Sequence, residues 1–369
     1  MGKPSLENTE IARFLKHTAW LLLPAVLSLL AGAALILAAG ENPLKTYASL
    51  FNAGFSCNSG PGRCALITSL TFATPLILTG LSATVALRGG FFSIGQAGQM
   101  LFGAAAASWL AGELSLPAGL HAMVALLGAA LFGGLWGLVP GMLKHFIGVN
   151  EILTTLFLNP VALVLVGLVK LPGAALSARL SPLAPSTKFT AGFLLALVAA
   201  LLVYLLLWRT AHGLEIRNSG AAPRFALYGG MPRHRPAILT MLFSGALAGL
   251  AGGIEVLGVH YHFVSAFSAV NEYDGLIVAF AGQLHPAGVL LFSVLLGGLR
   301  TGSLIGLQIR SGIPRELGGA LIALLLLFIA TSRFSNGKGM NSSLHAAGVP
   351  SQQSDPPCNV RGDSANPPA

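Results

Sequence analysis

Long apolar runs without a charged residue constrain this chain more than any other feature of its sequence. Residues 65–87 and 191–207 are two such runs, and about 20 apolar residues in a helix can cross the roughly 30 Å hydrocarbon core of a bilayer. Charged residues make up only 9% of the 369 positions, whereas a soluble domain carries about 25%. The sequence therefore predicts an all-α, polytopic integral membrane protein.

The apolar runs divide the chain into about ten segments, which we expect to form two pseudo-repeated halves. Two segments, 89–110 and 272–289, are short and interrupted by Gly or Pro, and they occupy corresponding places in the two halves. The polar stretch 41–64 is predicted to be an external loop. The eight full transmembrane helices are expected at 20–39, 65–87, 116–139, a run ending near residue 169, 191–207, 237–257, 287–305 and 317–330.

Polar sequence flanks this membrane region at both ends. Residues 1–18 form a leader with three cations and no small-residue cleavage site, so we expect an uncleaved first helix with a cytoplasmic N-terminus. Residues 19–334 are predicted to be the transmembrane domain. Residues 335–369 are rich in Ser, Pro, Asn and Gly with few large apolar groups. That composition is typical of a disordered tail, which we expect in the cytoplasm.

Positive charge is concentrated in residues 208–236, which carry five arginines against one acid, Glu215. Cationic loops resist translocation, so this segment is expected on the cytoplasmic side of the inner (plasma) membrane. Its length, its glycines and Tyr228 also predict a docking surface, in which Arg217 and Arg224 face acidic partner groups. Plain positive-inside orientation is the alternative explanation. Because the other cations lie mostly in short loops beside apolar runs, the net charge of +9 does not indicate nucleic-acid binding.

The two interrupted segments are the best pointers to a substrate pathway, because irregular backbone at membrane depth survives only beside a cavity. Ser93, Gln96 and Gln99 lie in the first segment and Asp274 in the second. Neutral hydroxyl and amide groups suit a polar, uncharged ligand such as a sugar or nucleoside. The alternative is that these side chains cross-link helices or satisfy broken backbone.

Two acids and an amide complete the candidate pathway. Glu255 and Asp274 are acids within apolar sequence, which are functional hypotheses by default. A structural role for both is the alternative. Asn159, before Pro160, is either a marker of a broken helix or a packing amide. His260 and His262 have no acid at α-helical spacing and are interpreted as interfacial polar groups rather than as metal ligands.

The sequence contains no motif typical of catalysis, phosphate binding or metal binding. Gly337 and Lys338 precede Gly339 rather than Ser or Thr, so no phosphate-binding loop exists, and no nucleophile motif or metal-ligand spacing appears. The chain is therefore predicted to be no enzyme and to hold no cofactor. Any ATP hydrolysis must come from a separate polypeptide. Cys57 and Cys64 flank a Gly-Pro-Gly turn, and both a disulfide and two free thiols remain open.

Four colinear stretches resemble the permease subunits of bacterial ABC importers for simple sugars, nucleosides and branched-chain amino acids, most closely the nucleoside (basic membrane protein type) permeases. They are residues 74–104, with the run RGGFFSIGQAGQ; 149–159, VNEILTTLFLN; 213–259; and 273–303, which begins YDGLIVAFAGQLHP. Relatives usually have Asn at the position of Ser93 and Glu at that of Ala97, and an aromatic residue where this chain has Pro160.

The resemblance implies the residues of a coupling helix and the partners of this chain. In the family the third stretch rests in a groove of the ATPase subunit, and the matching positions are Gly213, Arg217, Gly220, Arg224 and Tyr228. The family also implies two ATPase subunits that bind ATP and Mg²⁺, a second homologous permease or a second copy of this chain, and a periplasmic or lipoprotein substrate-binding protein. The expected cargo is a small polar solute.

The preferred interpretation is a permease subunit that imports a nucleoside with energy from ATP. Riboflavin, a simple sugar or an amino acid remains an alternative cargo, because one or two polar groups in a pocket decide specificity. An ion-coupled secondary transporter would also use broken helices. That class needs a cluster of buried carboxylates, whereas Glu255 and Asp274 are expected to be solitary.

Overall fold

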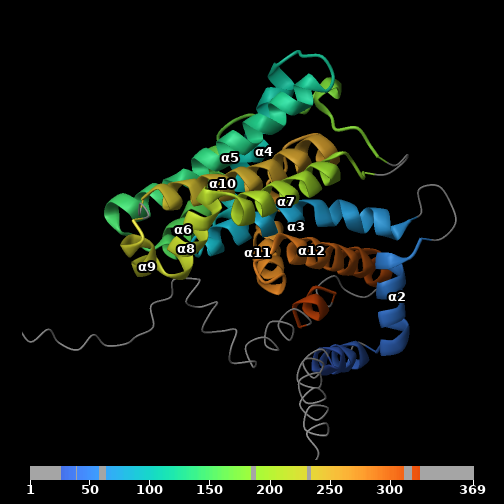
Figure 1. The fold of residues 1–369 in the computed structure, drawn as a ribbon. Helices are drawn as coiled ribbons and strands as arrows, with labels where there is room; N and C mark the ends of the chain where they lie inside the picture. The colour runs from blue at the N-terminus through green and yellow to red at the C-terminus, as the bar shows by residue number, and fades with distance from the viewer. Residues whose placement is uncertain are drawn as a thin grey trace, which may run out of the picture.

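The computed structural model describes residues 26–38, 40–57, 64–183, 188–230, 234–310 and 318–324. This part of the chain is helical, with two isolated β-bridges at its loops (Figure 1). A helix over Val26–Ala38 precedes α2 (Pro43–Phe55), α3 (Ala65–Arg88), α4 (Gln96–Glu113), α5 (Leu120–Ile147), α6 (Glu151–Gly167), η1 (Leu176–Ala178), α7 (Gly192–Arg209), α8 (Ala211–Ala221), α9 (Pro223–Tyr228), α10 (His234–Ile254), η2 (Glu255–His260), α11 (Ala266–Ala281), α12 (Pro286–Thr301) and η3 (Gly302–Arg310).

Several of these helices are long and apolar enough to cross a membrane, which confirms a multi-pass membrane protein. Within the described residues five helices qualify: Ala65–Arg88, Leu120–Ile147, Gly192–Arg209, Ile238–His260 and Pro286–Gln308. A sixth span results if Val26–Ala38 and α2, which meet at an angle of 112°, count as one. The leader 1–18 and the tail 335–369 lie outside the described residues, as do parts of the predicted first and last helices.

The predicted external loop 41–64 is wrong over much of its length, because α2 occupies Pro43–Phe55. The side chain of Asn42 caps this helix by accepting from the backbone N–H of Leu44 at 3.1 Å, and Pro43 stands at the first turn, where proline is tolerated. Beyond α2 a disulfide joins Cys57 and Cys64, which decides the alternative that the sequence left open.

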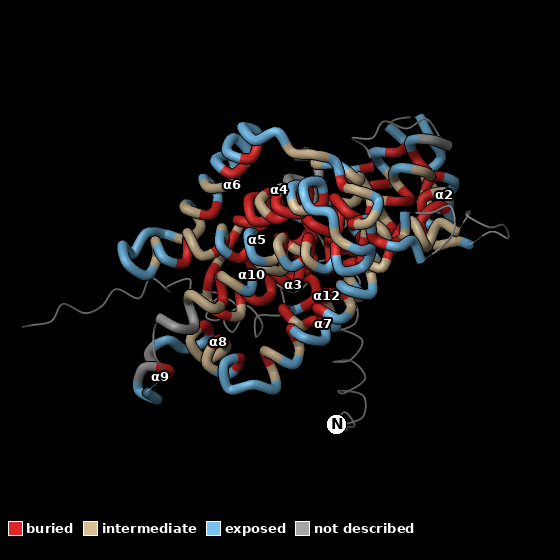
Figure 2. The backbone as a smooth tube through the Cα atoms, turned by 90° about the horizontal axis from the view of Figure 1, so that it is seen from above, coloured by how far each residue is buried: buried red, intermediate tan, exposed pale blue. Residues whose placement is uncertain are grey.

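Helix α3 forms the centre of the bundle. Its residues Leu76, Ile77, Leu78 and Leu81 are fully buried, and α3 packs against α7, α10, α11 and α12. A helix that is apolar on all sides is stable only when neighbours surround it. Figure 2 shows the buried backbone concentrated in this central region.

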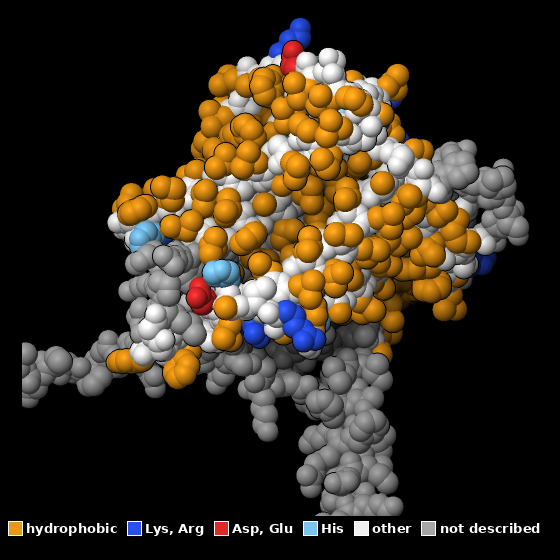
Figure 3. Space-filling view, turned by 45° about the horizontal axis from the view of Figure 1, so that its top comes forward, with side chains coloured by type: hydrophobic (Ala, Val, Ile, Leu, Met, Phe, Trp, Pro, Cys, Tyr) orange, Lys and Arg blue, Asp and Glu red, His pale blue; other side chains and the backbone are white. Residues whose placement is uncertain are grey.

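The outer helices present apolar side chains to their surroundings instead. Leu201 and Leu202 on α7 are 58% and 59% exposed, and Val164 on α6 is 63% exposed. Hydrophobic side chains cover most of the face seen in Figure 3. This exposure would be costly in water and matches a lipid environment.

Glycines join α10 to α5 by direct backbone contact. A Cβ on Gly245 would meet the carbonyl of Gly133, and a Cβ on Gly249 would meet the carbonyl of Ala129. Glycines recur every fourth residue in both helices, which gives each a smooth face for this close approach.

The interrupted segments differ from the prediction in length. The irregular backbone after α3 covers only residues 89–95, and α4 then continues to Glu113 as an 18-residue helix. In the second half α11 already begins at Ala266, before the predicted start at residue 272. The helical structure is interrupted at residues 282–285, where Gln283 and Leu284 adopt positive φ, and α12 begins at Pro286.

Candidate functional site

The turn between α3 and α4 brings four of the predicted pathway residues together. Ser93 lies in this turn, Gln96 and Gln99 stand in the first turn of α4, and Asn159 reaches them from α6. The side chain of Asn159 donates to the carbonyl of Ile94 at 2.7 Å. Its oxygen accepts from the backbone N–H of Gly98 at 2.9 Å. Asn159 therefore fixes the turn rather than marking a broken helix, since α6 continues through Pro160.

Thr155, one helical turn before Asn159, makes a third contact with this turn. Its hydroxyl oxygen accepts from the backbone N–H of Ile94 at 3.1 Å and donates to the carbonyl of Glu151 at 2.7 Å. Sequence reasoning had matched Thr155 to the family stretch but had not chosen it for the site. The only signal available was its spacing of four residues from Asn159, which puts both side chains on one face of α6.

Gln96 and Gln99 keep unused acceptors inside the bundle. Both side chains are at most 1% exposed, and within the described residues neither amide oxygen has a hydrogen-bond partner. The amide nitrogen of Gln96 donates to the carbonyl of Ser93 at 3.2 Å. A buried acceptor without a partner costs roughly 1–3 kcal/mol. Each of these oxygens can therefore accept strongly from an O–H or N–H group that reaches it.

Further buried hydroxyls extend this polar interior along α3. The hydroxyls of Ser82 on α3 and Ser244 on α10 lie 3.0 Å apart. Thr240 and Ser293 are fully buried, and no described group pairs with either hydroxyl. Sequence reasoning missed these residues because single Ser and Thr residues are common in apolar helices and carry no distinctive pattern.

Glu255 does not join this cluster but pairs with His260. Their side chains lie 3.3 Å apart, and Glu255 is 7% exposed. The sequence has no acid at α-helical spacing from His260, but residues 255–260 form a π-helix, which brings Glu255 to it. In a π-helix residues five apart lie nearly one above the other, whereas in an α-helix they diverge. No group of three or more possible metal ligands occurs in the described part of the chain.

Asp274 forms a separate ion pair with Arg300 that links α11 to α12. In the described part of the chain neither acid belongs to a cluster of carboxylates, as the sequence predicted, and each instead faces a His or Arg side chain. The predicted pathway residues thus lie in three places. Ser93, Gln96, Gln99 and Asn159 lie at the turn between α3 and α4, Glu255 pairs with His260, and Asp274 pairs with Arg300.

The predicted basic loop 208–236 is largely helical, which corrects its description as a loop. Thr210 caps α8 by accepting from the backbone N–H of Gly213 at 3.1 Å. A Cβ on Gly213 would meet the backbone of α7 at Leu206, and a Cβ on Gly220 would meet the carbonyl of Arg88. Both glycines are therefore needed for the close approach of α8 to the bundle.

Aromatic side chains project from α9. Tyr228 is 92% exposed and Phe225 is 69% exposed, and their spacing of three residues puts them on one side of the short helix. Arg217 is half-buried, with its guanidinium 5.5 Å from the ring centre of Trp208. The side chain of Arg224 lies outside the described part. The docking roles of Arg217, Arg224 and Tyr228 stay predictions.

Comparison with known proteins identifies relatives along nearly the whole chain. The family described as branched-chain amino acid transport system / permease component matches residues 65–330. A guanosine ABC transporter permease protein of Bacillus subtilis, NupP, is 34% identical over 88% of this chain and 97% of its own length.

Two further relatives name different cargoes. The nucleoside ABC transporter permease protein NupB of Lactococcus lactis is 31% identical over 84% of this chain and 89% of its own length. The glucose ABC transporter permease protein TsgB13 of Haloferax volcanii is 30% identical over 86% of this chain and 89% of its own length. No solved structure matches.

Proposed function

The chain belongs to the family of branched-chain amino acid transport system permease components, and from this premise we propose that it imports a nucleoside across the inner membrane. It is a multi-pass permease subunit of an ABC importer, a transport subunit rather than an enzyme. Such a permease works with ATPase subunits and a substrate-binding protein. ATP and Mg²⁺ are bound by the ATPase subunits, and this chain needs no cofactor of its own.

The nucleoside assignment depends chiefly on the guanosine permease that aligns with 97% of its length at 34% identity. A second nucleoside permease supports it. The unpaired oxygens of Gln96 and Gln99 fit a neutral ligand with several donors, and a nucleoside offers both ribose hydroxyls and base N–H groups. Glucose is the second candidate, because a glucose permease is 30% identical and a sugar also donates from neutral hydroxyls.

We place the substrate pathway at the turn between α3 and α4. Ser93, Gln96, Gln99 and Asn159 surround this turn, and buried hydroxyls continue from it along α3. In the described conformation Ser93 and Gln96 are fully buried, so passage requires the surrounding helices to separate. Glu255 and Asp274 would act as gates. Separating Glu255 from His260 would free η2, and breaking the Asp274–Arg300 ion pair would free the contact between α11 and α12.

The ATPase would dock on α8 and α9. Exposed Phe225 and Tyr228 provide the apolar anchors, and the arginines of this segment provide attraction to acidic groups. Gly220 of α8 contacts the backbone of Arg88 and Gly90 directly, and Gly90 precedes the turn with Ser93. A push on α8 would therefore reach the substrate pathway with no flexible side chain in between.

The same proposal fixes the arrangement in the membrane. The ends of the bundle that carry Arg88, Lys144 and α8 would face the cytoplasm together with both termini, and the Cys57–Cys64 disulfide would face outward. About ten segments in two pseudo-repeated halves would then form each permease. A second homologous permease or a second copy of this chain would complete the channel.

Uptake by cells that express this chain with its adjacent genes tests the proposal. Labelled guanosine, other nucleosides, glucose, riboflavin and branched-chain amino acids are offered separately, with ATP depleted or the proton gradient collapsed. Saturable nucleoside uptake that stops without ATP and survives loss of the gradient supports the proposal. Uptake of glucose alone would show that the cargo is a sugar rather than a nucleoside. Uptake that needs the proton gradient would contradict energy coupling to ATP.

A further inference from the structure

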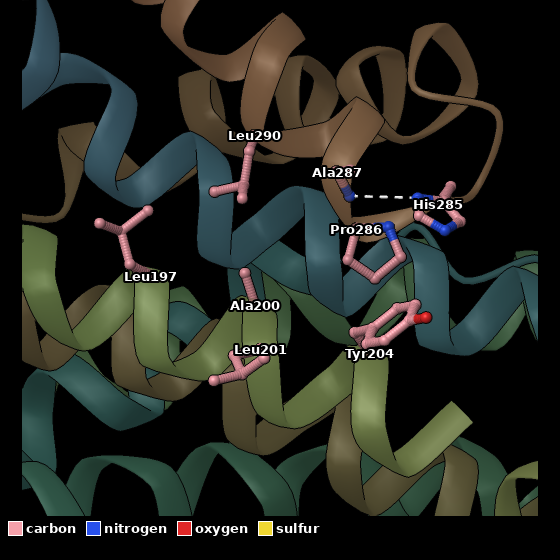
Figure 4. A pocket seen from close by; sticks show the side chains of 8 residues that line it. All are labelled: Leu197, Ala200, Leu201, Tyr204, His285, Pro286, Ala287 and Leu290. Atoms are coloured by element: carbon pink, nitrogen blue, oxygen red, sulfur yellow. Dashed lines mark hydrogen bonds between the residues drawn. The ribbon is translucent and has the colours of Figure 1, made fainter. Parts of the chain in front are cut away.

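A groove on the flank of the bundle lies apart from the substrate pathway. It has a volume of about 440 Å³ between α7 and α12, and Figure 4 shows its lining side chains. Leu197, Ala200, Leu201 and Tyr204 form the α7 side, at spacings that put them on one helix face. The α12 side consists of His285, Pro286, Ala287 and Leu290.

The lining excludes a polar solute as the occupant. Along most of the groove the side chains are aliphatic, so they offer no hydrogen bonds. The only polar side chains in the lining are Tyr204 and His285. The Nδ1 atom of His285 already accepts from the backbone N–H of Ala287 at 3.2 Å. A hydrocarbon chain fits this surface, because it needs no polar partner.

One end of the groove is aromatic and positively charged. The rings of Tyr204 and Trp208 stack with their centres 5.7 Å apart, and the ring of His285 lies 4.9 Å from that of Trp208. Tyr and Trp collect where hydrocarbon meets the headgroup layer of a membrane. The groove therefore runs from the membrane interior to its interface.

Two guanidinium groups lie at this aromatic end. Arg88 is 5.6 Å and Arg217 5.5 Å from the ring centre of Trp208. Arg88 donates to the backbone carbonyls of Gln283 and Leu284, at 3.2 and 3.0 Å. In the described part of the chain neither arginine has a carboxylate within ion-pair distance. Two like charges at one ring repel each other, and an anion between them relieves that repulsion.

We propose that this groove binds an anionic phospholipid, with an acyl chain along Leu197, Leu201 and Leu290 and the phosphate near Arg88 and Arg217. An apolar channel and a basic, aromatic end match the two parts of such a lipid. The site lies where α8 meets α3 and α7. The bound lipid would therefore hold α8 against the bundle, independently of which solute the protein carries.

Native mass spectrometry of the full-length chain tests this site. The protein is purified in mild detergent, stripped of lipid, and offered phosphatidylglycerol and phosphatidylcholine in equal amounts. We expect one phosphatidylglycerol per chain to be retained in preference to phosphatidylcholine. Equal retention of the two lipids, or of neither, would overturn the proposal.

Two tryptophan variants form a matched pair. Leu201→Trp fills the groove, whereas Leu202→Trp changes a side chain of nearly equal exposure, 59% against 58%, that does not line it. Only Leu201→Trp should lose the retained lipid, and equal retention by both variants would refute the site. If Leu201→Trp does not fold, Ala287→Phe replaces it, because Ala287 is exposed and also lines the groove.

The basic end is tested by Arg217→Gln. Because one cation near the headgroups changes the affinity for an anionic lipid about fivefold, the preference for phosphatidylglycerol over phosphatidylcholine should fall by about that factor. An unchanged preference would refute the role of Arg217. If Leu201→Trp instead separated two permease subunits without changing the retained lipid, the groove would be a protein interface and the lipid proposal would be wrong.

Discussion

Gly220 of α8 and Gly90 of the turn after α3 touch backbone to backbone. A Cβ on Gly220 would lie 2.6 Å from the backbone nitrogen of Gly90, and a Cβ on Gly90 would lie 2.9 Å from Cα of Gly220. Distances this short do not occur for real side chains, so neither position accepts one without a shift of backbone. The contact joins the predicted ATPase-docking helix to the predicted substrate pathway.

The first prediction concerns this contact. Gly220→Ala should push α8 away from the bundle, because the neighbouring atoms are backbone and cannot rotate aside. We expect uptake to fall at least tenfold while the protein still reaches the membrane. Gly229→Ala is the control, since a Cβ there meets only ordinary contacts at 3.5 Å. Equal uptake by the two variants would contradict a role for the Gly90–Gly220 contact.

The second prediction concerns the exposed aromatic residue on α9. Tyr228→Ala should weaken association with the ATPase subunits about tenfold or more, because a central aromatic anchor typically contributes about 2 kcal/mol to an interface. Thermal stability should not change, since Tyr228 is 92% exposed. Co-purification of the ATPase measures the effect. The control is Leu176→Ala, which is 80% exposed on the far loop; if it weakens association equally, α9 is not the docking site.

The third prediction concerns the acceptor on Gln96. Gln96→Leu removes an amide oxygen that has no described partner, together with the amide nitrogen that donates to the carbonyl of Ser93. The free energy of unfolding should therefore fall by only about 1 kcal/mol, while the KM for uptake of the cargo should rise about tenfold. The measurement combines uptake kinetics with thermal unfolding in detergent. A variant with normal KM would show that Gln96 does not contact the solute.

The fourth prediction separates two adjacent threonines on α6. The hydroxyl of Thr155 accepts from the backbone N–H of Ile94, whereas that of Thr154 bonds only to carbonyls of its own helix. Thr155→Val should therefore destabilise the protein by about 1–3 kcal/mol, because a half-buried N–H loses its partner. Thr154→Val should change stability much less. The measurement is the thermal unfolding of the two variants under one condition. Equal stability of the two would show that the contact between Thr155 and Ile94 does not stabilise the protein.

The fifth prediction concerns orientation. If the Cys57–Cys64 disulfide faces outward, a reductant that cannot cross the membrane should make both cysteines reactive toward an impermeant maleimide in cells with a permeabilised outer layer. Cys358, in the tail expected inside, should react only after the inner membrane is opened. Labelling of Cys358 before that step would reverse the proposed topology.

Two of the long helices could be predicted from the sequence almost to the residue, whereas the helix predicted at 116–139 forms Leu120–Ile147. Residues 65–87 were predicted and α3 covers Ala65–Arg88, while 191–207 became Gly192–Arg209. Hydropathy works for these elements because a membrane requires uninterrupted apolar length. The short helices α2, α8 and α9 were predicted as loops, since their composition is mixed and their ends depend on single caps such as Asn42 and Thr210.

The site could be predicted only in part, because its geometry depends on contacts between distant segments. The polar residues 93, 96 and 99 were found from the break in the helix pattern. Asn159 bonds to Ile94, 65 residues earlier, and no local pattern shows which turn it fixes. The contact of Glu255 with His260 could not be predicted, because the local π-helix changes the spacing at which side chains meet.

The glycine contacts between α5 and α10 have a mechanical consequence. With backbone against backbone at Gly133, Gly245 and Gly249, no side chain at these three positions can change rotamer to absorb a displacement. We therefore expect α5 and α10 to move as one rigid body, so that any hinge for alternating access lies elsewhere.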